Sequence, residues 1–169
     1  MRHMSHSSDE LFPPVAIAAR NVVPKLIGWL TDTACVLSLI EIGRINQMLS
    51  AYESETSHQL AVLTVPTLDG DSIESFSRRV ANDWKLGRER ANNGILVVLA
   101  MRERAARIEL GEGFEPHIPA AKAAEIINES MIPNFAKGEI GKGIEAGILR
   151  LQQEARKMVI SSETMPEQL

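Results

Sequence analysis

The sequence is short of the residue types on which several classes of protein depend. A single cysteine in 169 residues, Cys35, excludes an internal disulfide bond and a cysteine-rich metal cluster. Aromatic residues make up 4% of the chain, so the stacking platforms that bind single-stranded nucleic acids are scarce. The formal net charge of −4 creates no basic field that would attract nucleic acid or an anionic membrane. We therefore expect no nucleic-acid partner.

Long apolar runs are missing as well. No run of about 20 apolar residues occurs, so we expect no transmembrane helix in this chain. The apolar run 11–19 is interrupted by two prolines, which argues against a signal peptide. With 44% hydrophobic residues, the chain suits one soluble domain with an aliphatic core. Cys35 stands in an apolar context, and we expect it to be a small hydrophobic core residue.

Hydrophobic periodicity divides the chain into helical and extended segments. The predicted helices span residues 38–54, 72–86, 119–131 and 139–159, and the predicted strands span residues 59–66, 94–101 and 105–110. Residues 28–32 are expected to add one more short strand. Ser38 and Glu41 form a capping box at the start of the first helix. The apolar stripe of that helix is predicted to be Leu39, Ile42, Ile45, Leu49 and Tyr52.

The order of these segments predicts the topology. Gly87 is expected to end the second helix, and Pro133 to break the third. A strand, a helix and a strand in succession predict a right-handed crossover between parallel strands. The strand at 105–110 follows its predecessor too closely for a crossover, so it should be antiparallel. The fold class is therefore α/β, a three-layer α/β/α sandwich with a small, mixed, largely parallel sheet of about four strands.

The predicted domain covers residues 28–159. Residues 1–27 are rich in proline and lack a sustained period, so we interpret them as an extended N-terminal arm. Residues 160–169 are expected to form a C-terminal tail.

Oxygen-bearing side chains lie at the ends of two successive strands. Asn92 and Asn93 precede one strand, and Glu112 and Glu115 follow the next. Because antiparallel neighbours bring the start of one strand beside the end of the other, these side chains should meet at one rim of the sheet. Carboxylate and amide oxygens are ligands that calcium prefers, so the four residues are candidate metal ligands. A turn with solvated glutamates is the alternative interpretation.

Asp32 is a fifth candidate metal ligand, although its segment is expected to begin at the opposite rim and would have to reach back across roughly 16 Å. The alternative role of Asp32 is a local cap or turn former. Gly111, Gly113 and Arg107 are candidate ligand-binding residues in or beside the segment that follows the strand at 105–110 and carries Glu112, which we call the acidic loop. No nucleophile and base with recognisable catalytic spacing occurs, so catalytic residues remain unknown; an exposed loop histidine is the preferred interpretation of His117.

The order of short motifs in this chain resembles that of the TPM domain family. This family is named for a plant thylakoid lumen protein, a photosystem-repair protein and a worm receptor-modulating protein. The resemblance runs from about Leu30 to Leu151. Its main motifs are Thr31-Asp32-Thr33-Ala34, Gln59-Leu60-Ala61-Val62, Trp84-Lys85-Leu86-Gly87, Asn92-Asn93-Gly94-Ile95-Leu96, Arg107-Ile108-Glu109-Leu110-Gly111-Glu112-Gly113-Phe114-Glu115 and Pro133-Asn134-Phe135.

The resemblance implies a Rossmann-like fold, a location on the outer side of a membrane, calcium binding, and an acid-phosphatase activity. Asp32 and Glu115 match acids of the family pattern. Asn92 and Asn93 stand where members often have Asp, and Ala120 also falls at a common Asp position. Glu112 replaces a frequent aromatic residue. The resemblance therefore implies a calcium site with fewer carboxylates than usual and correspondingly weak affinity.

Three functional hypotheses follow. The leading one is a cell-envelope module that binds a divalent cation, calcium first, or a partner protein, or both, through the rim around Asn93 and Glu115. The second is a weak, metal-assisted acid phosphatase acting on phosphomonoesters. The third is a structural adaptor without metal. We expect a monomer that is extracytoplasmic or membrane-associated, as the resemblance implies.

Overall fold

Four strands form one sheet in the order β1-β2-β3-β4 in the computed structural model, which describes residues 22–87, 92–114 and 116–163. The strands are β1 (Leu30–Asp32), β2 (Gln59–Val65), β3 (Gly94–Ala100) and β4 (Ala105–Leu110). β1, β2 and β3 are parallel, whereas β4 is antiparallel to β3. The predicted mixed, largely parallel sheet of four strands is confirmed.

The sheet has two ends that matter for function. At the amino end, β2 and β3 begin and β4 ends, because Gln59 lies opposite Gly94 and Leu110 lies opposite Ile95. At the carboxyl end, the three parallel strands end and β4 begins.

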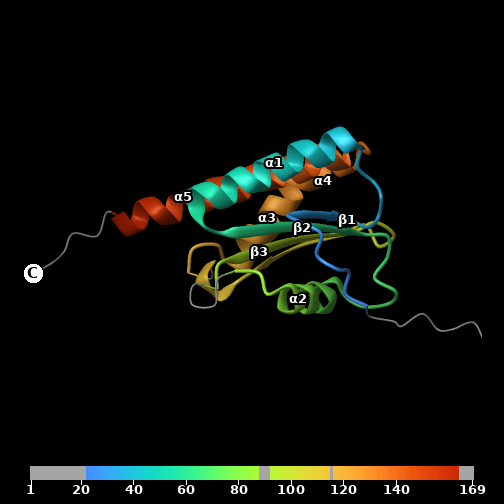
Figure 1. Ribbon diagram of the computed structural model, residues 1–169, viewed down its shortest axis with the longest axis horizontal. Coiled ribbons are helices and arrows are strands. Elements are labelled where there is room, and N and C mark those ends of the chain that lie inside the picture. The colour runs from blue at the N-terminus through green and yellow to red at the C-terminus, as the bar shows by residue number, and fades with distance from the viewer. Residues whose placement is uncertain (1–21, 88–91, 115, 164–169) are drawn as a thin grey trace, which may run out of the picture.

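Helices cover both faces of the sheet (Figure 1). One face packs against α1 (Leu39–Thr56), α3 (Ala120–Ile126) and α5 (Ile140–Glu163), and the other packs against α2 (Ile73–Trp84). The strands alternate accordingly: Val62 and Val97 belong to the α1 side, and Leu63 and Val98 to the α2 side. The architecture is therefore a three-layer α/β/α sandwich.

The two crossover connections have opposite hands. β1, β2 and β3 follow one another in the same direction across the sheet, yet α1 and α2 lie on opposite faces. A right-handed crossover is the general rule for parallel strands, so the rule holds for one of these two connections only.

The first helix begins as predicted. The Ser38 hydroxyl accepts a hydrogen bond from the Glu41 amide, and the Glu41 carboxylate accepts one from the Ser38 amide, which completes the capping box. The predicted stripe is wrong at its first position, because Leu39 is 87% exposed. The side chains that are fully buried in this helix are Ile45, Leu49 and Tyr52.

Two predicted helix ends differ from the structure. α2 ends at Trp84 with Lys85 in the left-handed conformation, so Gly87 lies beyond the helix; its own amide donates to Gln59 Oε1 at 2.7 Å. Pro133 does not break the third helix. The chain widens into a π-helical turn (Ile127–Met131) and continues into α4 (Ile132–Phe135), whose first turn contains Pro133.

Cys35 was expected in the core and is instead exposed. It lies in a turn with a positive φ of 54°, and its own amide donates a hydrogen bond to the Asp32 carbonyl at 3.3 Å. Local apolar context therefore gave the wrong environment for this thiol. Among the described residues, no helix is both long enough and apolar enough to cross a membrane.

Candidate functional site

The amino end of the sheet brings two predicted site segments into direct backbone contact. The Gly111 amide donates to the Gly94 carbonyl at 2.8 Å, and the Gly113 amide donates to the Asn92 carbonyl at 3.2 Å. A Cβ on Gly111 would lie 2.1 Å from the Asn92 carbonyl oxygen. Any other residue would clash with this oxygen, so the position requires glycine. Asn92 itself has a positive φ of 44°, a conformation that asparagine tolerates well.

The two asparagines have different roles in this arrangement. The Asn93 side chain donates from Nδ2 to the Ser57 carbonyl at 3.2 Å, and its own carbonyl accepts from the Gln59 amide at 3.3 Å. Asn93 therefore ties the end of α1 to the start of β3. Asn92 is exposed and borders an open pocket together with Glu112.

That pocket lies on the α2 side of the sheet and has a volume of about 470 Å³. It combines predicted residues with three polar residues of α2 and its C-cap that sequence reasoning missed: Arg78, Asn82 and Lys85. These three follow at spacings of four and three, which places them on one helix face. The spacing was visible in the sequence, but nothing local indicated that this face borders the Asn92 loop. We call this the amino-end pocket.

Arg107, a predicted ligand-binding residue, is already engaged. Its Nε donates to Glu109 Oε2 at 2.8 Å, and both side chains are partly buried. Because this ion pair compensates Glu109, the remaining charged side chains among the described residues that line the amino-end pocket are Arg78, Lys85 and Glu112. The pocket is thus of mixed charge and not a purely acidic cluster.

Asp32 lies at the other end of the sheet. It pairs with Thr64 near the end of β2, five residues from Gln59 at the amino end, which is about 17 Å along a strand. Its carboxylate accepts hydrogen bonds from the Leu37 amide at 3.1 Å, the Val36 amide at 3.3 Å and the Thr64 hydroxyl. The structure therefore separates Asp32 from the other candidate ligands and shows it shaping the turn after β1.

The remaining acids at the carboxyl end also have local partners. Glu103 Oε1 accepts from the Thr67 hydroxyl and the Leu68 amide, each at 2.9 Å, and these bonds hold the pKa of Glu103 below its usual value, the Leu68 amide contributing most. Asp71 forms an ion pair with Arg79 at 2.6 Å. Both acids thus stabilise loops, and no cation site follows from them.

Glu115 lies outside the described residues. Its neighbour His117 is exposed, and its amide donates to the Phe114 carbonyl at 2.9 Å. Within the described parts of the chain, no group of three or more His, Cys, Asp or Glu side chains is placed to hold a metal ion. At the amino-end pocket, Asn92 and Glu112 supply one amide and one carboxylate, fewer oxygens than the six to eight that calcium takes.

A second histidine is partly buried near the same end of the sheet. His58 Nδ1 lies 3.1 Å from the Tyr52 hydroxyl, and its ring meets Phe114 edge-on at 5.0 Å between centroids. Burial lowers the pKa of His58 and raises the pKa of Tyr52 to about 12. The cluster is a packed junction between α1, β2 and the acidic loop, and none of its three residues is among those that line the amino-end pocket.

Comparisons with known proteins agree with this fold. The family model of the TPM domain matches residues 30–154. The N-terminal domain of a protein from P. gingivalis, solved by NMR, is similar at 33% identity with a TM-score of 0.72, covering 78% of this chain and 84% of that one. A comparison with curated proteins gives no match.

Two further NMR structures share the fold at lower identity. The BA42 protein from the psychrophilic bacterium Bizionia argentinensis is 17% identical with a TM-score of 0.63, over 72% of this chain and 82% of that one. The N-terminal domain of the cg2496 protein from Corynebacterium glutamicum is 15% identical with a TM-score of 0.61, over 78% and 83%.

Proposed function

Because the chain belongs to the TPM domain family, we propose that it acts as a binding module and that the amino-end pocket is its ligand site. The observation that carries this proposal is the lining of the pocket, where Asn92, Gly111 and Glu112 meet the side chains of Arg78 and Lys85. No serine, threonine, cysteine or histidine is among the described residues that line it. A pocket without a nucleophile or imidazole base favours binding over covalent catalysis.

Calcium is the first candidate ligand, and its affinity should be low. Glu112 and Asn92 supply oxygens, Glu115 would have to add a second carboxylate, and water would complete the shell. Arg78 and Lys85 oppose a dication in the same pocket. The expected dissociation constant is that of weak extracellular modules, about 10⁻⁴–10⁻³ M or weaker, which suits an extracytoplasmic location as part of this proposal.

A calcium titration followed by amide resonances tests this ligand. Calcium at about 10 mM should shift the amides of Asn93, Gly94 and Glu112, and at ten times the dissociation constant it should stabilise the fold by about 1.4 kcal/mol. Glu112→Gln and Glu115→Gln should weaken the response. Asp69→Asn, at the carboxyl end, is the control and should leave it unchanged. A titration that moves no resonance at the amino end would exclude calcium as the ligand.

A phosphomonoester anion is the second candidate, because Arg78, Lys85 and Asn82 present donors to the same pocket. Lys85→Gln separates the two candidates by opposite signs. It removes a positive charge, so it should strengthen calcium binding and weaken binding of phenyl phosphate. Lys137→Gln, an exposed lysine after α4, is the matched control. Turnover of a chromogenic phosphomonoester that persists through purification and falls in Lys85→Gln would favour the phosphatase hypothesis instead. If neither ligand binds, the metal-free adaptor is the remaining hypothesis.

A further inference from the structure

The outer edge of β4 is unpaired in the sheet formed by the described residues. Gly111 lies opposite Gly94 and donates a hydrogen bond to it. In an antiparallel pair every second residue bonds its partner in this way, so the backbone groups of Glu109, Arg107 and Ala105 point toward β3. The amides and carbonyls of Ala106, Ile108 and Leu110 therefore point away from β3. No fifth strand pairs with them in the described sheet.

A groove follows this unpaired edge. Open space of about 450 Å³ borders every residue from Ala106 to Leu110. One wall is α3, with small side chains at Ala120, Ala123 and Ala124, and the other is the first turn of α2, with Ile73 and Glu74. The groove thus has the elements of a strand-binding site: free backbone donors and acceptors between two walls of side chains.

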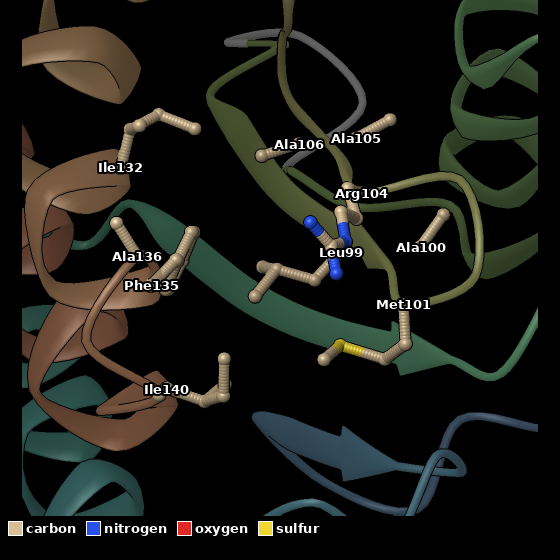
Figure 2. Close-up of a pocket in the computed structure, with 11 residues that line it drawn as sticks. Leu99, Ala100, Met101, Arg104, Ala105, Ala106, Ile132, Phe135, Ala136 and Ile140 are labelled. Atoms are coloured by element: carbon tan, nitrogen blue, oxygen red, sulfur yellow. The ribbon is translucent and has the colours of Figure 1, made fainter.

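An apolar pocket adjoins the start of β4. It has a volume of about 640 Å³ and shares the lining residue Ala106 with the groove, so both spaces border β4 at this residue. Leu99 and Met101 point across it toward Phe135 and Ile140 of the α4–α5 region (Figure 2). Its size and apolar lining suit one or two large apolar side chains.

Among the described residues that line the apolar pocket, Arg104 is the charged one. It is exposed, and within the part of the chain that the structure describes its guanidinium forms no ion pair. A carboxylate placed at this position would find an uncompensated cation beside an apolar pocket.

We propose that β4 binds the C-terminal segment of a partner protein as an added antiparallel strand. Because β4 runs from Ala105 to Leu110, an antiparallel strand ends beside Ala105 and Arg104. Its terminal carboxylate then meets Arg104, and its last apolar side chain enters the apolar pocket. A parallel strand would place its amino terminus at Arg104, where the charges repel. The direction, the pocket and the cation thus select one occupant, a free C-terminus that ends in an apolar residue.

The proposal is independent of the amino-end pocket and goes beyond the proposed function. The probe is a synthetic peptide of about eight residues that alternates Thr and Val and ends in Leu with a free carboxylate. It should shift the amides of Ala106, Ile108 and Leu110 in the full chain. The same peptide with a C-terminal amide should bind at least about tenfold more weakly, since it loses the ion pair. A version N-methylated at alternate residues should not bind, because its strand edge is blocked.

Matched variants assign each part of the site. Arg104→Gln should bring the acid and amide peptides to within about twofold of each other, whereas Arg102→Gln in the same turn should preserve their difference. Ala124→Gln fills the groove and should weaken binding of both peptides. Ala121→Gln, on the same helix but outside the groove, should not.

Several results would overturn the proposal. Absence of amide shifts with about 2 mM free-acid peptide would do so, as would equal binding of the acid and amide peptides or retained binding of the N-methylated peptide. Concentration-dependent dimerisation that Ala124→Gln abolishes would show that a second copy of this chain occupies the edge instead.

Discussion

At the scale of single residues, glycine is required where two backbone segments approach each other at the amino end of the sheet. Gly111 faces the Asn92 carbonyl and Gly94 faces Leu86, each closer than a Cβ would allow. These two glycines allow the loop at Asn92, the acidic loop and the segment after α2 to pack closely against one another. Other glycines have no such constraint; Gly43 in α1 has no atom within 4 Å of the position of a Cβ.

Gly111→Ala and Gly43→Ala should therefore change stability in opposite directions. The added methyl of Gly111→Ala forces the Asn92 carbonyl aside and should destabilise the fold by about 1–3 kcal/mol. Gly43→Ala should stabilise α1 by about 0.5–1 kcal/mol, because alanine loses less backbone entropy in a helix. Urea unfolding followed by circular dichroism measures both. Equal effects of the two substitutions would show that the close contact at Gly111 is absent in solution.

At the scale of elements, His58 joins three parts of the fold. Its ring lies between Tyr52 of α1 and Phe114 of the acidic loop, and the next residue begins β2. Burial lowers the pKa of His58, so the folded protein favours the neutral ring. This junction connects the end of α1 to the loop that carries Glu112.

Stability should consequently depend on pH through His58. Its pKa is lower in the folded than in the unfolded chain, where it is about 6.5, so the unfolded chain binds more protons between the two values. The stabilising contribution of neutral His58 is present above about pH 6.5 and is lost as the pH falls below it toward the folded pKa. Thermal melts of the wild type and His58→Gln across this range measure the difference. His117→Gln, at an exposed histidine, is the control and should follow the wild type.

At the scale of the whole molecule, two hydrophobic clusters enclose the middle of one sheet. β3 is buried along its entire length, and β2 is buried from Leu60 to Val65. β1 has three residues and one strand neighbour, and β4 has an unpaired outer edge. The centre of the sheet should therefore be the most stable part of the fold.

Native-state hydrogen exchange should rank the strands accordingly. The amides of Val62 and Val97 should exchange only through global unfolding, since they lie in the two central strands. Outward-facing amides of β4, such as Ala106, should exchange much faster. Comparable protection at Ala106 and Val97 would mean that the outer edge of β4 is covered in solution, which would also contradict the strand-binding proposal.

A structural feature could be predicted from the sequence when the residues that form it lie close together in the chain. The capping box at Ser38, the strand after Asn93-Gly94 and the short hairpin between β3 and β4 depend on residues within a few positions of each other, so the local pattern determined them. The order of such segments also determined the α/β class and the resemblance to the TPM domain family. The contact between the loops of Asn92 and Gly111 followed from the same hairpin.

Tertiary structure alone decided which other residues share the site. The order of the segments already predicted that Asp32 begins at the far rim, and only the parallel pairing of Asp32 with Thr64 showed that it stays there and does not reach back to the other candidate ligands. Arg78 and Lys85 border the amino-end pocket because α2 covers the opposite face from α1. Pairing register and the choice of face both arise from packing between segments distant in the chain, which composition and periodicity do not encode.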